Sequence, residues 1–358
     1  MGKGISIYMG LNYSLEDNIR YIKVARENGF DRIFTSLHIP EANYDIIINE
    51  FTSIIREAKT LGMKVIADIS PKGFEYLNIQ QNDLRKIKEF GIDVLRIDYG
   101  FSPEEIAGFT KNEFGLKIEI NGSTVTEKFL REFESYGPCL ENMQACHNFY
   151  PRMNTGISID SLLRKNDMLK NLDMEISAFI PSLINKRPPL QEGLPTLEMH
   201  RFLKPEICAK HLYALGVDNV FFGDSIPSDK EICEVGSIPE DIIELKVNPM
   251  VSDNVSLDML NYKSYTNRSD GAEDLVRAVE SRMCMNSGVV KLGHITYRKK
   301  GSITVDNEGY LRYMGELQIC RRDLKEDSRV NVIGMVIEEE LFLLDYIKDE
   351  SKFRFKIV

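Results

Sequence analysis

The sequence predicts an α/β fold, a (β/α)8 TIM barrel followed by a small, mostly β domain. From residue 4 to about residue 235, short apolar, β-branched runs alternate with amphipathic helical patterns, which is typical of βαβ units. Eight such runs occur, and 358 residues suit a barrel of roughly 250 residues with an appended module. An open doubly wound sheet is the alternative, but eight strands close most economically as a barrel.

Glycines mark the junctions between the expected helices and strands. Ser14 is placed to cap the first helix, Gly29 to end it, and Gly62 to end the second. The same order recurs at 28–33, 61–66, 90–95 and 215–220: a helix ends, a glycine follows, then comes an Asp or Met, and a strand begins. The strands are expected at 4–10, 31–37, 64–70, 94–100, 116–122, 140–148, 174–182 and 219–225.

The pattern changes after about residue 240. One helix-like stretch is followed by alternating strands, with a turn signal at 306–309. We therefore expect a barrel domain at 1–238 and a β-rich domain at 239–358.

Composition restricts the classes of function. The chain is 43% hydrophobic and 28% charged, so a large core needs no disulfide or metal. The six cysteines show no CxxC pair, and neither a signal peptide nor a membrane-spanning run is evident. These features predict a cytoplasmic protein with reduced thiols and no membrane partner. A net charge of -10 argues against nucleic acid, although a small anion remains a suitable ligand.

Charged side chains alternate with apolar ones in the fourth and fifth strands. Leu95 and Ile97 occupy one face, which directs Arg96 and Asp98 into the barrel. The fifth strand likewise directs Lys117, Glu119 and Asn121 inward. An ion-pair layer that fills the lumen is one interpretation. Catalysis is the other, particularly for Asp98 and Glu119 at the carboxyl ends of their strands.

Other carboxylates end neighbouring strands. Asp68 closes the third strand and Asp224 the eighth. Two carboxylates at adjacent strand ends suit glycoside hydrolysis, in which one protonates the leaving oxygen and the other attacks the sugar or activates water. Lyases, aldolases and isomerases also use carboxylates, and Lys72 follows the third strand. No histidine spacing indicates a metal site, so we expect neither metal nor cofactor.

Two loops combine cationic and rigid residues. The loop after the sixth strand contains His147, Asn148 and Arg152, and a proline-rich loop after the seventh contains Arg187 and Arg201. Arginine binds phosphate or carboxylate in a bidentate manner. Solvated arginines on a stiff connection are the alternative, which we favour for the neighbouring Lys186. The chain has no tryptophan, which favours a small substrate over a polymer.

Several motifs together resemble one bacterial family. They are FTSLHIPEANYD (34–45), ADISPKGF (67–74), LRIDYGF (95–101), EINGSTVT (119–126), CHNFYPRMNTGIS (146–158), RPPLQEGLPTLEMHR (187–201) and Gly223-Asp224. The chain resembles the 6-phospho-N-acetylmuramidase family, formerly described as outer surface proteins. The resemblance covers essentially the whole chain and departs from the family only at RPPLQEG, where Gly-Pro after the arginine is more usual.

The resemblance implies a TIM barrel with a cyclophilin-like second domain and an exo-acting glycosidase. The substrate would be the disaccharide of 6-phosphorylated N-acetylmuramic acid and N-acetylglucosamine, a small anionic phosphosugar from cell-wall (peptidoglycan) recycling. We assign Asp98 and Glu119 as the catalytic pair, with Asp68 and Asp224 as alternates or supporting groups. The candidate substrate-binding residues are Ser36, His38, Asp68, Asn121, His147, Asn148, Arg152, Arg187, Glu198, Arg201 and Asp224.

Two other functions stay open at this point. A barrel aldolase or isomerase could act on a sugar phosphate, using Lys72. A non-catalytic phosphosugar-binding protein is the other. The second domain would either cover the barrel mouth or supply a homodimer contact.

Overall fold

The computed structural model describes residues 1–10, 13–36, 44–77, 79–80, 83–283 and 288–358. Eight parallel strands form a closed barrel in chain order, and a second sheet of seven strands follows. The predicted fold class, a TIM barrel with a smaller β-rich domain, is confirmed. The barrel strands are β1 (Gly2–Ile7), β2 (Arg32–Ser36), β3 (Lys64–Asp68), β4 (Val94–Ile97), β5 (Lys117–Asn121), β6 (Met143–Cys146), β7 (Glu175–Ile180) and β8 (Asn219–Phe222).

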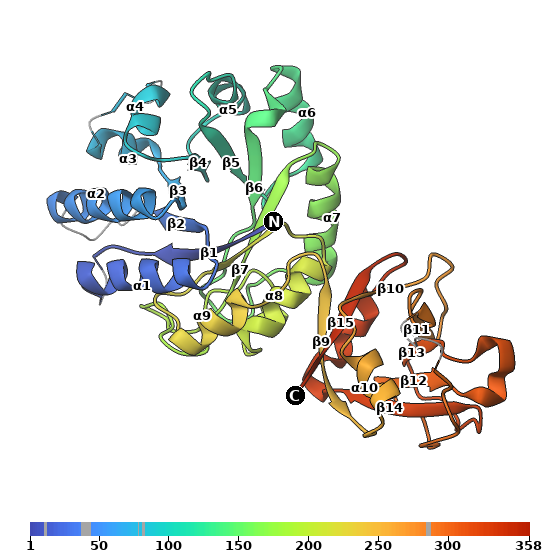
Figure 1. Ribbon diagram of the computed structural model, residues 1–358. Helices are drawn as coiled ribbons and strands as arrows, with labels where there is room; N and C mark the ends of the chain where they lie inside the picture. The colour runs from blue at the N-terminus through green and yellow to red at the C-terminus, as the bar shows by residue number, and fades with distance from the viewer. Residues whose placement is uncertain (11–12, 37–43, 78, 81–82, 284–287) are drawn as a thin grey trace. The chain divides into compact units, whose positions relative to one another are not determined.

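Helices surround the barrel strands (Figure 1). Ser14 caps α1 as predicted, because its side chain accepts the backbone N–H of Asp17 while the Asp17 carboxylate binds Ser14 in return. The helices are α1 (Leu15–Glu27), α2 (Tyr44–Thr60), α3 (Pro71–Tyr76), α4 (Leu84–Glu89), α5 (Pro103–Thr110), α6 (Glu127–Ser135), α7 (Ile159–Lys170), α8 (Pro205–Ala214) and α9 (Asp229–Gly236), with short 3₁₀ helices η1 (Leu140–Asn142) and η2 (Glu198–His200).

Pairing of β8 with β1 closes the barrel. Gly2 lies opposite Asn219 and Gly4 opposite Phe221. A Cβ atom on Gly4 would lie 2.1 Å from the Phe221 ring, so only glycine lets this ring pack across the closing seam.

The inner face of the barrel has an aromatic side. Phe34, Phe179 and Phe221 are buried in one cluster, against which Phe149 packs from the loop after β6. The Phe149 and Phe179 rings meet edge to face with centroids 5.1 Å apart. These rings form a packed, apolar part of the wall of the lumen.

A row of polar residues also faces the lumen, mostly on the same strands that carry the apolar cluster. Each is paired in register with the next across consecutive parallel strands, so they share one face of the sheet. Because barrel strands are tilted and staggered, the row descends from the carboxyl end of β2 to the start of β7. The row consists of Ser36, Asp68, Arg96, Glu119, Gln144 and Glu175.

The last residue of this row, Glu175, lies at the amino-terminal end of the barrel. Arg32 of β2 donates to Glu175 of β7 across 2.7 Å, and Lys117 lies 3.8 Å from the same carboxylate. Lys117 therefore takes part in an ion pair at the end of the barrel opposite to the carboxyl ends of the strands, where barrel active sites lie.

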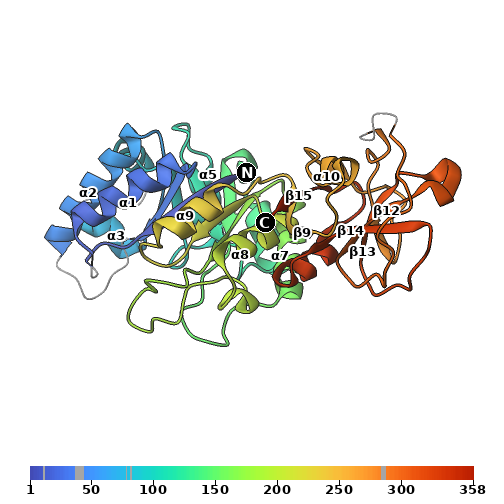
Figure 2. The ribbon, with the colours of Figure 1, turned by 60° about the horizontal axis from the view of Figure 1, so that its bottom comes forward.

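Residues Pro239–Val358, with Tyr213–Leu215, form the second compact unit. Its sheet has the order β10-β15-β9-β14-β12-β13-β11, and α10 packs against β15 (Figure 2). Its core includes Leu260, Tyr265, Ile303 and Phe353. The elements are β9 (Ile243–Pro249), α10 (Asn254–Leu260), β10 (Tyr265–Thr266), β11 (Leu275–Arg277), β12 (Ser302–Asp306), η4 (Glu308–Tyr313), β13 (Leu317–Cys320), β14 (Val330–Val336), η5 (Glu338–Tyr346) and β15 (Lys352–Ile357).

Two further features bear on the sequence-based expectations. In the described part of the chain, no helix is both long enough and apolar enough to cross a bilayer. Free thiols are found at Cys139, Cys146, Cys208, Cys233 and Cys320, while Cys284 lies outside the described residues.

Buried histidines predict a loss of stability in acid. Burial lowers the pKa of His147 and of His211 to about 4, and lowers the pKa of His200 well below its usual value. His200 Nε2 lies 2.9 Å from His211 Nδ1, so protonation of both rings would place two charges side by side.

Unfolded histidine titrates near pH 6.5, so the folded protein binds fewer protons than the unfolded chain below that pH. Stability is fully present above about pH 6.5 and falls as the pH drops toward 4. We expect the free energy of unfolding, measured with urea, to decrease between pH 7 and pH 5 by roughly 2 kcal/mol per buried histidine. An unchanged value over this range would contradict the burial of neutral rings.

Candidate active site

A pocket of about 270 Å³ opens among the carboxyl ends of the barrel strands. We call it the mouth pocket. It combines carboxylates, two arginines and aromatic rings, the composition expected of a site for a small polar ligand. Its lining residues are Tyr8, Phe34, Ser36, Asp68, Arg96, Asp98, Asn148, Phe149, Phe179 and Arg187.

Two carboxylates of the mouth pocket come from adjacent strands. Asp68 is the last residue of β3, and Asp98 follows β4 directly. The Ser36 hydroxyl donates to Asp68 across 3.3 Å. Asn121 donates to Asp98 across 2.7 Å, and the Asp98 side chain is 34% exposed. Both carboxylates can therefore reach a ligand in the pocket.

Glu119 lies in a different environment. Its side chain is 1% exposed, one oxygen accepts from Arg96 and the other from Gln144 at 2.6 Å. Burial raises the pKa of the Glu119 carboxyl, and Arg96 and Gln144 oppose that shift. Glu119 is not among the lining residues. The expected catalytic pair, Asp98 and Glu119, therefore does not share a pocket. Asp68 and Asp98 line the same pocket instead.

Arg96 is the link between the buried row and the pocket. Its guanidinium donates to Glu119 at 3.2 Å, to the Cys146 carbonyl at 3.1 Å and to the Asn148 side chain at 2.6 Å. It also lies 3.8 Å from Asp98. Because these contacts span β4, β5 and the end of β6, Arg96 fixes the position of the pocket floor.

Arg187 reaches the pocket from the long loop after β7. Its guanidinium lies 4.0 Å from the centre of the Tyr8 ring and 5.5 Å from that of Phe149, a cation–π arrangement that holds the charge in place. Among the described residues, no carboxylate forms a salt bridge with this guanidinium. The pocket therefore presents one cation without an anionic partner.

Asp224 organises the loop that carries Arg187. It is fully buried, and its carboxylate accepts backbone N–H groups of Ser182, Arg187 and Leu194 at 2.8, 2.9 and 3.2 Å. Burial raises the pKa of the Asp224 carboxyl, and these donors oppose the shift. Asp224 thus positions the loop, as the supporting role considered for it requires, and it lies outside the pocket lining. Its expected contact with substrate stays a prediction.

Arg201 and Glu198 also hold loops in position. Arg201 is fully buried and donates to the carbonyls of Tyr150, Arg152, Glu192 and Gly193. It also pairs with Glu198 at 2.6 Å. Hydrogen bonds from Arg201 lower the pKa of Glu198 to about 2, supported by the backbone N–H groups of Asn154 and Gly156. The expectation that both side chains bind substrate does not agree with these contacts, because their polar atoms already hold the loops after β6 and β7 together.

Replacing Arg201 by lysine is expected to lower the free energy of unfolding by roughly 3 kcal/mol, because an ammonium cannot satisfy four carbonyls and a carboxylate at once. Urea unfolding measures the change, and limited proteolysis should show earlier cleavage in the loops. Arg152→Lys is the matched control, since the Arg152 side chain is exposed. Equal stability of the two variants would contradict the role assigned to Arg201.

The remaining candidate residues lie in four different surroundings. Asn148 lines the mouth pocket and binds Arg96, and Asn121 positions Asp98. His147 is fully buried between Asn166 at 2.8 Å and Ser123 at 3.2 Å, so it supports the wall rather than meeting a ligand. Arg152 is exposed and does not line the pocket. His38 lies outside the described residues.

The aromatic lining residues of the mouth pocket were not among the residues expected to bind substrate. Phe34 and Phe179 share the inward face of their strands with Ser36 and Ser177, which is the one signal that could have placed them in the lumen. Tyr8 follows β1 directly and Phe149 lies in the loop after β6, but the sequence does not show that both face Arg187.

Comparison with protein-family models decides the relationship. The amino-terminal model of 6-phospho-N-acetylmuramidase matches residues 3–237, and the carboxyl-terminal model matches residues 243–356. The chain belongs to the 6-phospho-N-acetylmuramidase family. The family resemblance drawn from the sequence motifs is thereby confirmed. No curated protein matches the chain.

Two solved structures are similar to the chain over nearly its whole length. An uncharacterized protein of B. cereus is 32% identical over 99% of both chains, with a TM-score of 0.87. A conserved protein of unknown function from Enterococcus faecalis is 32% identical over 100% of this chain and 96% of its own, with a TM-score of 0.72. Both similarities extend over the barrel unit and the β-rich unit of the chain.

Proposed function

We propose that the protein is a glycosidase that cleaves 6-phospho-N-acetylmuramic acid from N-acetylglucosamine in a phosphorylated cell-wall disaccharide. Family membership supports the reaction class. The observation that carries the proposal is that Arg187, which forms a salt bridge with no carboxylate of the described residues, lies in the same pocket as Asp68 and Asp98. Arg187 can bind an anion, while Asp68 and Asp98 can act on a glycosidic bond.

The two carboxylates divide the chemistry between them. Asp98 faces the amide N–H of Asn121 and the guanidinium of Arg96, an environment that suits a group acting as a carboxylate, either as nucleophile or as base for water. Asp68 contacts the Ser36 hydroxyl, which can donate or accept and so tolerates a protonated acid. We assign Asp68 as the acid that protonates the leaving oxygen.

Arg187 would bind the anionic part of the sugar, its phosphate or its lactyl carboxylate. A guanidinium offers two parallel N–H donors to either group. Tyr8 and Phe149 supply flat surfaces beside it. Together these groups would hold the sugar with its glycosidic bond toward the carboxylates.

An aldolase mechanism receives less support. Schiff-base chemistry needs an amine in the pocket, and the described lining residues include no lysine. Lys72 stands exposed on the first turn of α3 and does not line the pocket.

Turnover tests the proposal directly. Incubation of the protein with the phosphorylated disaccharide should release free N-acetylglucosamine. A folded protein that releases none under any buffer condition, yet converts another sugar phosphate, would favour the aldolase or isomerase alternative. Ligand binding without turnover would favour a binding protein.

Replacing Arg187 by alanine is expected to lower kcat/KM for the phosphorylated disaccharide by about 10- to 100-fold, because a hydrogen bond to a charged group contributes roughly 1.5–3 kcal/mol. The effect should appear mainly in KM. Lys186→Ala is the matched control, since Lys186 precedes Arg187 but does not line the pocket. Equal losses in both variants would remove Arg187 from anion binding.

A further inference from the structure

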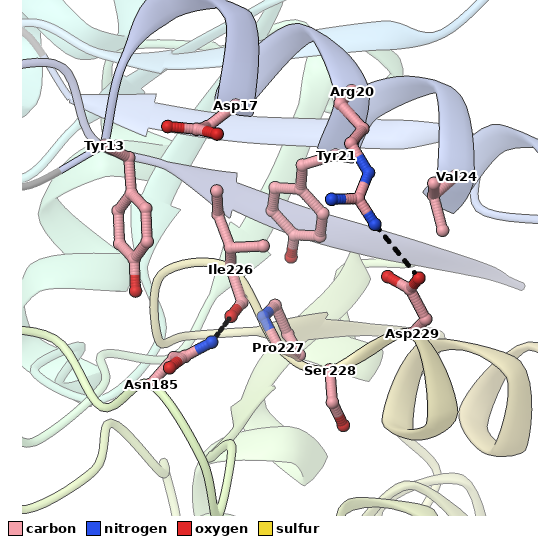
Figure 3. A pocket seen from close by; sticks show the side chains of 10 residues that line it. All are labelled: Tyr13, Asp17, Arg20, Tyr21, Val24, Asn185, Ile226, Pro227, Ser228 and Asp229. Carbon is pink, nitrogen blue, oxygen red and sulfur yellow. Dashed lines mark hydrogen bonds and ion pairs between the residues drawn. The ribbon is translucent and has the colours of Figure 1, made fainter.

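Two pockets of the barrel unit each have an asparagine in their lining, and the two side-chain amides differ. Asn185 borders a pocket of about 380 Å³ beside α1, where it donates to the Ile226 carbonyl at 2.9 Å (Figure 3). The arginine of that pocket, Arg20, is likewise paired, with Asp229 at 3.2 Å. Asn148 lines the mouth pocket, and its amide, in contrast, keeps donors that a ligand can meet.

Asn148 is held in one orientation by three hydrogen bonds. Its backbone N–H donates to the Ser123 hydroxyl at 3.0 Å, and its backbone carbonyl accepts from the Thr196 hydroxyl at 2.8 Å. Its side-chain oxygen, Oδ1, accepts from Arg96 at 2.6 Å. A guanidinium only donates hydrogen bonds, so the atom that meets Arg96 must be the amide oxygen. The other side-chain atom, Nδ2, is therefore fixed as a donor.

The Nδ2 atom of Asn148 has no hydrogen-bond partner among the described residues. It is also open to solvent, because Asn148 is only half-buried and its amide nitrogen is not among the enclosed polar atoms. A donor that is held in place in this way favours a ligand that brings an acceptor to it, since a ligand without one leaves the donor unpaired. Asn148 can therefore contribute to specificity.

The position of Asn148 relative to Asp98 indicates which part of a sugar it meets. The Arg96 Nη2 atom lies 2.6 Å from Asn148 Oδ1 and 3.8 Å from Asp98 Oδ1, so both side chains approach the same nitrogen. If Asp98 acts at the anomeric carbon, as the proposed function requires, Asn148 lies beside the substituent on the next ring carbon. In an N-acetylhexosamine this substituent is the acetamido group.

An acetamido group matches the two kinds of surface in this part of the mouth pocket. Its carbonyl oxygen is a neutral acceptor for an amide N–H. Its methyl group is apolar and can pack against Phe149, Phe34 and Phe179, which line the same pocket. The Phe149 ring meets Phe34 and Phe179 edge to face, with centroids 6.3 and 5.1 Å apart, so this surface is already packed in place.

We propose that Asn148 selects substrates by the acetamido group beside the anomeric carbon, with Nδ2 donating to its carbonyl oxygen. The inference rests on the proposed function, because it places the anomeric carbon at Asp98. It adds a requirement on the substrate, since a sugar with a hydroxyl group in place of the acetamido group would lose both the carbonyl acceptor and the methyl contact.

Equilibrium binding to the full chain tests the proposal without turnover. The probes are N-acetylglucosamine 6-phosphate and glucose 6-phosphate, which both carry the phosphate for Arg187 and differ only in the group beside the anomeric carbon. We expect the acetamido sugar to bind about 5-fold or more tightly, the effect of one hydrogen bond. Asn148→Asp keeps the acceptor for Arg96 but replaces the donor by an acceptor. It should abolish or reverse the preference, because a hydroxyl can donate to the new carboxylate and a carbonyl cannot.

Two further variants complete the design. Asn148→Ala removes the donor without adding a charge, and it should also lose most of the preference. Asn154→Asp is the matched control, because it adds the same charge at an exposed position of the loop after β6, outside the pocket lining. This control should keep the affinity ratio of the parent protein. The ratio cancels any effect of the added charge on the phosphate, which both probes share.

Equal affinity of the parent protein for the two probes, or no binding of either at millimolar concentration, would overturn the proposal. So would a preference that both Asn148→Asp and Asn148→Ala leave intact. An unchanged probe ratio together with weaker binding of 6-phospho-N-acetylmuramic acid to Asn148→Asp would direct Nδ2 to the lactyl carboxylate instead. A preference that depends on Asn148, in a protein that cleaves no disaccharide, would count against the proposed function and leave the selection of the acetamido group standing.

Discussion

Replacing Asp98 by asparagine is expected to reduce kcat on the phosphorylated disaccharide by about 10²–10⁴-fold, the range for loss of a positioned acid–base group. The amide keeps the size of the side chain but cannot attack the sugar or take a proton from water. Asp68→Asn should cause a loss in the same range, because no acid would then protonate the leaving oxygen. Substrate affinity, measured by titration, should change little, since Arg187 remains.

Asp173→Asn provides the matched control for these two variants. Asp173 is exposed and has a φ of 55°, a backbone conformation that asparagine adopts readily. Its turnover should equal that of the parent protein. Full activity in both Asp98→Asn and Asp68→Asn would rule out a carboxylate pair in the mouth pocket.

Replacing Arg96 by methionine is expected to lower the free energy of unfolding by about 3–5 kcal/mol, because it would leave the Glu119 carboxylate buried without its counter-charge. Arg96 is 3% exposed and Glu119 is 1% exposed, so water cannot replace the lost partner. The double variant Arg96→Met/Glu119→Gln should regain part of the loss, since no charge is then left unpaired. Urea unfolding of the two single variants and the double variant measures the coupling.

Glu119→Gln alone separates the two roles considered for Glu119. If Glu119 only holds Arg96, this variant should be less stable but should keep turnover within about 10-fold of the parent protein. A folded Glu119→Gln protein that has lost turnover as completely as Asp98→Asn would restore Glu119 to the catalytic pair.

The barrel was predictable because its signals are local. Each strand is a short apolar run, and glycines such as Gly29, Gly62 and Gly216 adopt positive φ where a helix ends. These features need no knowledge of distant contacts. The expected strand ends differ from those observed by a few residues, because polar residues such as Asp98 continue the alternation of β4 into its following loop.

The site was predictable only in part, because side-chain contacts between distant segments decide the roles. Alternation places Arg96, Asp98 and Glu119 on one side of their strands, but it does not show how deep each lies in a tilted barrel. Arg187 and Arg201 look alike in the sequence. One faces an open pocket, while the other donates to carbonyls from two loops. Charge and spacing cannot distinguish these cases without the path of the loops.

The most direct test of the central claim is a crystal structure of the Asp98→Asn variant with the phosphorylated disaccharide bound. We predict that the phosphate or the lactyl carboxylate contacts the Arg187 guanidinium, with the glycosidic oxygen within hydrogen-bond distance of Asp68 and the anomeric carbon beside residue 98. A disaccharide bound away from the mouth pocket, or one whose glycosidic oxygen lies far from both positions, would contradict the assignment of this pocket as the active site.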